Sequence, residues 1–125
     1  MAVGGVPVPS PSHAEAVANM SLEVLEALKD FNEKNIKALG GKPWNIRIGL
    51  HTGSVVAGVI GKKKYLYDLY GESVTTATLM ESSGSPGKIH VSQDTYEQLK
   101  NKFNFTEEKA VQLKEGEVCN SKCEI

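Results

Sequence analysis

The sequence predicts an α+β fold, and three observations support this prediction. Strand-like and helix-like segments alternate along the chain, turns rich in glycine and proline separate them, and one long amphipathic helix lies in the N-terminal third. The length of 125 residues suits a single domain, and a hydrophobic fraction of 40% is sufficient for a buried core. The composition excludes a collagen-like, coiled-coil or fully disordered chain.

The N-terminal elements are a strand and a long helix. The strand is expected over residues 1–6, before a proline-rich loop, and because no strand precedes it, the sheet is expected to be incomplete. The helix is expected over residues 13–39, where Ser12 and Glu15 form a capping box and Gly40 and Gly41 mark the end. The side chains expected to face the core are Val17, Met20, Val24, Leu28 and Phe31.

Strands and short helices alternate through the rest of the chain. Strands are expected at residues 45–51, 55–60, 65–70 and 88–92. Helices are expected at residues 74–83 and 93–101, with Ser73 and Ser92 as their N-terminal caps. Two short strands are expected between residues 103 and 114, followed by a polar tail over residues 115–125. This order is typical of ferredoxin-like packing, with the helices on one face of a mixed or antiparallel sheet.

Charge and cysteine content exclude several classes of function. The 14 basic and 15 acidic side chains give a net charge of −1, so neither a nucleic-acid partner nor an anionic membrane surface is expected. The two cysteines, Cys119 and Cys123, have no histidine cluster near them and are a weak metal or redox signal. No signal peptide or membrane span is expected. The expected location is the cytoplasm, whether or not a longer parent protein is attached to a membrane.

Among the candidate motifs, Asp68 is the one for which a functional role stays open. The glycine-rich stretch at residues 53–62 has the glycine spacing of a phosphate-binding loop, but lacks the Lys and Ser or Thr that must follow. The lysines at residues 62–64 are interpreted as a solvated turn, and the three histidines are too scattered to predict a site. A carboxylate inside an aromatic strand, however, needs a hydrogen-bond partner or a place at the edge of a cleft. Both explanations of Asp68 stay open.

Four motifs together resemble the catalytic domain of class III nucleotidyl cyclases, the adenylate and guanylate cyclase family. They are MAVGGVP (residues 1–7), RIGLHTGSVVAGVIG (47–61), YDLYGESV (67–74) and MESSG (80–84), and they occur in the family's order. The resemblance covers residues 1–114 as the C-terminal part of a cyclase domain, and residues 115–125 form a divergent polar tail. It implies an incomplete ferredoxin-like cyclase fold, in which the first strand, the first helices and part of the central hairpin are absent.

The resemblance also implies a reaction and its partners. The family converts ATP or GTP to a 3′,5′-cyclic nucleotide and pyrophosphate for intracellular signalling, at the interface of a homodimer or heterodimer of cyclase domains. Two ions of Mg²⁺ or Mn²⁺, held by two aspartates, activate the ribose 3′-hydroxyl and neutralise the triphosphate. Those aspartates belong to the part of the domain that precedes residue 1, so no metal ligand is expected in this chain.

Four residues match functional positions of the family. Asp68 matches the residue that reads the base, where a carboxylate favours ATP over GTP. Lys114 matches the lysine that binds the triphosphate, although EGE at residues 115–117 replaces the family's Gly-Lys-Gly. Thr75 stands at the asparagine that orients the ribose, and Leu79 at the arginine that stabilises the transferring phosphoryl group. Loss of one such donor costs about 10²–10³ in rate.

The chain alone is therefore expected to be inactive. Three interpretations stay open: the C-terminal part of a cyclase domain, a non-catalytic cyclase-like subunit or dimerisation module that regulates a partner cyclase, and an unstable fragment with an incomplete sheet. The chain is interpreted first as the C-terminal part of a cyclase domain, and the replacements at Thr75 and Leu79 add support to the second interpretation.

Overall fold

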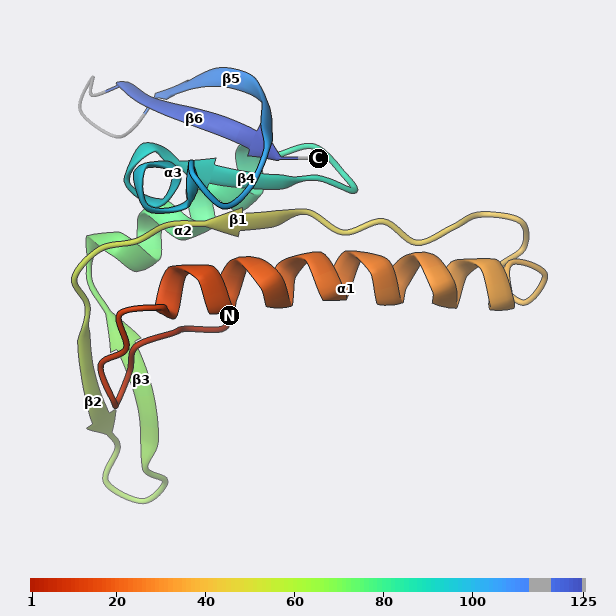
Figure 1. Cartoon of the computed structure of the whole chain (residues 1–125). Helices are drawn as coiled ribbons and strands as arrows, with labels where there is room; N and C mark the ends of the chain where they lie inside the picture. The colour runs from red at the N-terminus through yellow and green to blue at the C-terminus, as the bar shows by residue number, and fades with distance from the viewer. Residues whose placement is uncertain (113–117, 125) are drawn as a thin grey trace.

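The computed structural model describes the backbone of residues 1–112 and 118–124 and the side chains of residues 1–105. Three helices and six strands form the α+β fold that the sequence predicts (Figure 1). The helices are α1 (His13–Asn35), α2 (Glu72–Ser83) and α3 (Gln93–Leu99). The strands are β1 (Ile48–Leu50), β2 (Val56–Ile60), β3 (Leu66–Tyr70), β4 (Ile89–Ser92), β5 (Phe105–Gln112) and β6 (Val118–Glu124).

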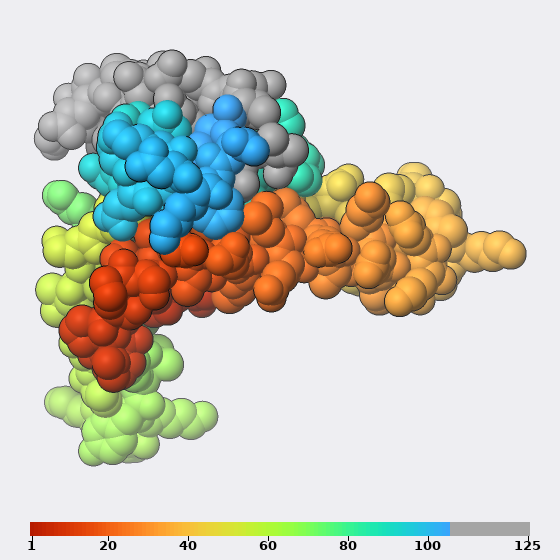
Figure 2. All heavy atoms as spheres, in the orientation of Figure 1, coloured from red at the N-terminus to blue at the C-terminus, as the bar shows by residue number. Residues whose placement is uncertain are grey.

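The strands form two separate sheets. Four of them make a mixed sheet in the order β1-β4-β6-β5, in which β1 and β4 are parallel and β6 runs antiparallel to both β4 and β5. The other two, β2 and β3, form an antiparallel hairpin. This hairpin projects away from the four-stranded sheet, and Figure 2 shows both it and the end of α1 standing out from the body of the domain.

The helices cover both faces of the four-stranded sheet. Successive side chains of a strand point to opposite faces. Ile89 and Val91 of β4 accordingly enter the buried core that α1 and α3 share, whereas Nδ1 of His90 lies 2.8 Å from the carbonyl oxygen of Met80 in α2. The expectation that all helices lie on one face is therefore wrong. The order of elements along the chain does not determine which face of the sheet the helix after the hairpin covers.

Close packing between α2 and β1 depends on a glycine. A Cβ atom on Gly49 would lie 2.1 Å from the backbone nitrogen of Glu81 and 2.6 Å from the carbonyl carbon of Met80. The helix backbone thus occupies the space that any larger residue in β1 would need. This contact fixes α2 against the sheet.

The N-terminal segment does not form the strand expected over residues 1–6. It packs against the start of α1 instead, where a Cβ atom on Gly4 would lie 3.0 Å from both the carbonyl oxygen of His13 and Cγ2 of Val17. None of the described strands pairs with this segment, so its backbone has no ladder to join. The predicted capping box is also wrong, because the N-cap residue Ser12 makes no side-chain hydrogen bond to the helix.

Helix α1 ends at Asn35 rather than at residue 39, and residues 36–41 form turns. Its buried face also differs from the expected one, since Met20, Val24 and Phe31 are 43%, 41% and 41% exposed. The buried residues of the helix are Ala14, Ala18 and Ser21. Small side chains allow the helix to approach the core closely, and Val17, Leu22 and Leu25 pack partly buried against it. Met20 and Val24 are exposed, and Phe31 contacts Trp44, with their ring centroids 5.6 Å apart.

Several other boundaries differ from the prediction. Helix α2 begins at Glu72 with Gly71 as its N-cap, so Ser73 lies inside the first turn. Ser92 is the N-cap of α3, as predicted, but makes no side-chain capping bond. One strand, β5, replaces the two short ones, and β6 lies in the segment expected to be a tail. β6 lies between β4 and β5 and forms backbone hydrogen bonds with both. This pairing makes the segment a strand, although its polar sequence does not indicate one.

Candidate functional site

Asp68 lies in the middle of β3, directly opposite Gly58 of β2. Its Oδ1 accepts a 2.8 Å hydrogen bond from the backbone N–H of Leu69. Apart from Gly58 and its chain neighbours, no described heavy atom lies within 4 Å of the place that a Cβ atom on Gly58 would take. Paired residues project on the same side of a hairpin, so this open space lies on the same side as the Asp68 side chain. The structure thus combines a local backbone bond with room for an incoming hydrogen-bond donor.

The hairpin that carries Asp68 is apolar and exposed. Its exposed large side chains are Val56, Val59, Ile60, Tyr65, Leu66, Tyr67 and Tyr70. Only Leu69 among its large side chains is buried, at 8% exposure. By the register of the hairpin, Val56, Ile60, Leu66 and Tyr70 lie on the same face as Asp68, and Val59 and Tyr67 lie on the opposite face, so both faces of the hairpin expose apolar side chains. The three lysines at the turn, residues 62–64, are exposed, as a solvated turn requires.

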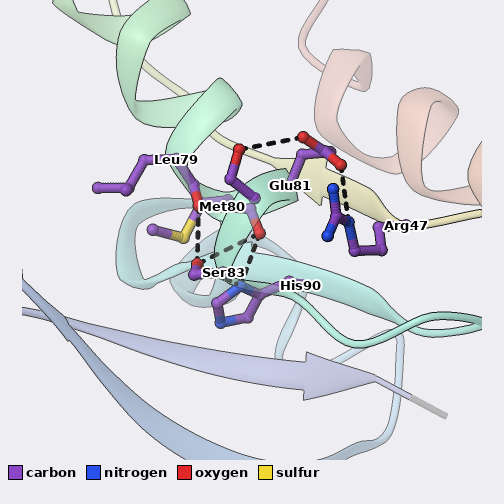
Figure 3. A network of polar contacts seen from close by, with 7 residues as sticks. Arg47, Leu79, Met80, Glu81, Ser83 and His90 are labelled. Atoms are coloured by element: carbon purple, nitrogen blue, oxygen red, sulfur yellow. Dashed lines mark hydrogen bonds and ion pairs between the residues drawn. The ribbon is translucent and has the colours of Figure 1, made fainter.

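Thr75 and Leu79 lie one turn apart on α2, which follows β3 directly. Thr75 is exposed and Leu79 is half-buried, and neither can offer a positive charge. The chain contains a single arginine, Arg47, whose Nε lies 2.9 Å from Oε1 of Glu81. Figure 3 shows the Leu79 side chain pointing away from this ion pair. Arg47 therefore does not replace the arginine that the resemblance places at Leu79.

His90 belongs to a buried network on α2 rather than to a reactive site (Figure 3). Its Nδ1 lies 2.8 Å from the carbonyl oxygen of Met80, which only accepts, so this nitrogen carries the proton. Ser83 Oγ donates to the carbonyl oxygen of Leu79 at 2.7 Å. The first of these bonds pairs Nδ1 of a histidine that is 0% exposed and joins β4 to the end of α2.

His51 lies at the end of β1, in a second polar cluster that the sequence did not predict. Its Nδ1 is 2.7 Å from Ser92 Oγ and 3.9 Å from Oδ2 of Asp94. Both groups face the same ring nitrogen, so the three cannot act as a proton-relay triad, which needs both nitrogens. Burial lowers the pKa of His51 below its usual 6.5, and the Asp94 carboxylate partly opposes this shift.

A cavity of about 680 Å³ lies between the N-terminal segment, the first turns of α1, the end of β1 and α2. Most of its lining is apolar, and its polar lining includes His51, Thr52, Ser73 and Thr95. Asp68, Thr75 and Leu79 are not among the lining residues. The predicted site residues therefore lie on the hairpin and the following helix, outside this cavity.

The described residues do not fit a catalytic metal ion. No three His, Cys, Asp or Glu side chains among them gather closely enough to hold one. Lys114, the expected triphosphate ligand, lies outside the described residues. The part of the chain that the structure describes also contains no helix with the length and hydrophobicity to cross a membrane.

The fold belongs to the α+β class of domains, with a projecting hairpin that carries the Asp68 carboxylate. The model of the adenylate and guanylate cyclase catalytic domain matches residues 1–124. The chain therefore belongs to the adenylate and guanylate cyclase family.

Individual proteins that are similar to this chain also belong to the adenylate and guanylate cyclases. A guanylate cyclase soluble subunit beta-2 from Rattus norvegicus is 47% identical over 82% of this chain, and an adenylate cyclase from Mycobacterium tuberculosis is 38% identical over 91%. The chain spans only 14% and 25% of their lengths. The guanylate cyclase domain of RhGC from Catenaria anguillulae, solved in complex with GTP, superposes with a TM-score of 0.86 at 34% identity, covering 98% of this chain and 64% of that one. The fold is thus an incomplete cyclase domain.

Proposed function

We propose that this chain forms the C-terminal part of a nucleotidyl cyclase domain that acts on ATP in preference to GTP. In this reaction the ribose 3′-oxygen attacks the α-phosphorus, the bond to the β,γ-diphosphate breaks, and a 3′,5′-cyclic nucleotide and pyrophosphate form. The observation that carries the proposal is the position of Asp68 beside the open space at Gly58.

Asp68 would read the base. An ionised carboxylate only accepts hydrogen bonds, and adenine presents a donor, its exocyclic amine, where guanine presents a carbonyl oxygen. A carboxylate that faces a carbonyl leaves two acceptors unpaired, which disfavours GTP. The open space at Gly58 is on the side of the hairpin from which the base would approach.

The chain alone is proposed to be inactive. The described residues offer no ligand set for Mg²⁺ or Mn²⁺, so no step of the reaction is assigned to a metal within this chain. Thr75 and Leu79 supply neither the amide nor the guanidinium that the resemblance implies at their positions. By the resemblance, the aspartates that hold the metal ions lie in another part of a cyclase domain than this chain. The exposed apolar hairpin is the surface proposed to contact a second cyclase domain.

The second candidate function is that of a non-catalytic subunit that regulates a partner cyclase. The uncharged face of α2 at Thr75 and Leu79, together with the engagement of Arg47 by Glu81, favours this candidate. Such a subunit would bind the partner through the hairpin without completing an active site.

One assay distinguishes the two functions. Cyclic AMP and cyclic GMP are measured from ATP and GTP with Mn²⁺, using the chain alone and mixed with a cyclase subunit that carries both metal-binding aspartates. Product from the mixture beyond that of the subunit, with ATP preferred, supports the catalytic proposal. The additional product is expected to be lost in Asp68→Asn but not in Asp30→Asn on α1. This result would assign the additional activity to the base-reading carboxylate.

Other outcomes point elsewhere. A changed activity of the partner that Asp68→Asn does not affect supports the regulatory subunit. Product from the chain alone would contradict the proposal that the metal-binding aspartates outside this chain are required. An unaltered partner activity at micromolar concentrations of the chain would remove both functions.

A further inference from the structure

Residues 51–54 connect β1 to the projecting hairpin, and we call them the hairpin base. Three of them, His51, Thr52 and Ser54, make polar contacts with residues outside their own segment, and Gly53 lies close to Ser73. These contacts tie the connection to two parts of the domain: the end of β4 with the start of α3, and α2.

The first half of the hairpin base is bound to the end of β4 and the start of α3. His51 Nδ1 lies 2.7 Å from Ser92 Oγ, and Thr52 Oγ1 lies 3.0 Å from Thr95 Oγ1. Ser92 and Thr95 are only 0% and 2% exposed, and their own hydroxyl oxygens are 3.3 Å apart. Because the partners are buried in a rigid part of the fold, they hold this half of the connection in one place.

The second half is bound to α2. Ser73 Oγ, in the first turn of α2, donates a 2.7 Å hydrogen bond to the carbonyl oxygen of Ser54. Gly53 lies so close that a Cβ atom there would be 2.3 Å from the same Ser73 Oγ. This serine therefore joins the chain that enters the hairpin to the chain that leaves it.

The hairpin depends on these contacts for its direction. It pairs with no strand of the four-stranded sheet among the described residues, and Leu69 is its only large side chain that is buried. A two-stranded hairpin has little stability of its own. Its orientation relative to the domain is thus set where its two strands begin and end (Figure 1).

We propose that the hairpin base is a polar clamp that sets the direction of the hairpin, and that Thr52 and Ser73 are positioning residues for Asp68. Asp68 lies two residues from the end of β3, about 7 Å along the strand. A rotation of about 10° at the base would move it by about 1 Å, a displacement that can cost about 10²-fold in rate. This inference depends on the proposed function in one respect, which is that Asp68 contacts the nucleotide.

The test is nuclear magnetic resonance on the whole chain without nucleotide. Residual dipolar couplings of backbone amides are fitted separately for the hairpin and for the four-stranded sheet, which gives the alignment of each. The parent chain is expected to show one common alignment. In Ser73→Ala, and in Thr52→Val, the hairpin is expected to lose alignment while the sheet keeps its own.

Two controls remove hydroxyl groups elsewhere on α2. Ser82→Ala removes a 3.2 Å bond to Glu81 Oε2, and Thr78→Val removes a 3.0 Å bond to the carbonyl oxygen of Val74. Both are expected to leave the common alignment unchanged.

The outcomes decide the proposal without any assay of activity. A common alignment retained in both Ser73→Ala and Thr52→Val would overturn it, and so would an equal loss of alignment throughout the domain, which indicates a general loss of stability. Since no nucleotide is present, failure of the clamp and failure of the cyclase proposal are separate results.

Discussion

Arg47, the single arginine of the chain, is bound to Glu81 of α2 through a 2.9 Å contact between Nε and Oε1. The two side chains are 45% and 39% exposed, so this pair contributes at most about 1 kcal/mol to stability. Its importance is chemical. The chain has no second guanidinium to offer a transferring phosphoryl group at Leu79.

Restoring the two missing polar groups on α2 is expected to raise the rate of cyclic nucleotide formation. Thr75→Asn combined with Leu79→Arg supplies an amide and a guanidinium on one face of the helix. In a mixture with a subunit that carries the metal aspartates, the expected gain is about 10²-fold or more, because such donors stabilise charge in the transition state. Thr78→Arg, at the exposed position before Leu79 and about 100° from it around the helix, is the control. An equal gain in that control would contradict the assignment of Leu79.

Filling the space beside Asp68 is expected to reduce nucleotide turnover without unfolding the chain. Gly58→Val places a branched side chain where nothing described lies within 4 Å, so the fold has room for it. Valine also favours a strand more than glycine does. The thermal unfolding midpoint is expected to stay the same or rise, while cyclic AMP formation in the mixed assay falls. Unchanged turnover would show that the base does not approach Asp68 from this side.

Adding a methyl group at the contact between β1 and α2 is expected to destabilise the domain. In Gly49→Ala the Cβ atom would meet the backbone of Glu81 at 2.1 Å, and helix backbone cannot move aside as a flexible side chain does. The expected loss is about 1–3 kcal/mol in the free energy of unfolding, measured by urea titration. Gly58→Ala, with open space around its Cβ atom, is the matched control and should lose nothing. Equal stability of the two variants would disprove the close approach of α2.

Acidification is expected to weaken the fold through His51. Burial lowers its pKa below 6.5, so between 6.5 and that lower value the unfolded chain binds a proton that the folded chain does not. The free energy of unfolding therefore falls as pH decreases through this window, and the contribution is fully present only above it. Urea unfolding from pH 7.5 to 5 in His51→Gln is expected to lack this component.

The Asp94 carboxylate gives a second check on the same histidine. It raises the pKa of His51 against the effect of burial. Asp94→Asn is therefore expected to lower that pKa further and to widen the range over which acid destabilises the domain. A narrower range would mean that another group is responsible for the pH dependence.

Motifs and periodicity predicted the family and the order of helices and strands between residues 13 and 101, because these depend on local side-chain patterns and on a long run of matching residues. They also singled out Asp68 as a candidate site residue, since a carboxylate in an apolar strand needs an explanation from its sequence context alone. The polar contacts of His51, Thr52 and Ser73 were missed. Their partners are 41, 43 and 19 residues away in sequence, and no local pattern announces a contact at such separations.

What the sequence determined by itself was the helix or strand class of the segments between residues 13 and 101 and the family to which the chain belongs. Only the tertiary structure decided that residues 1–6 pack on α1 rather than form a strand, that β6 lies within the sheet, and that α2 covers the opposite face from α1. Strand pairing and helix placement depend on which distant backbone groups find partners, and backbone groups are the same in every residue except proline. Side-chain patterns therefore predict the local structure, whereas the arrangement of the elements in space is known only from the tertiary structure.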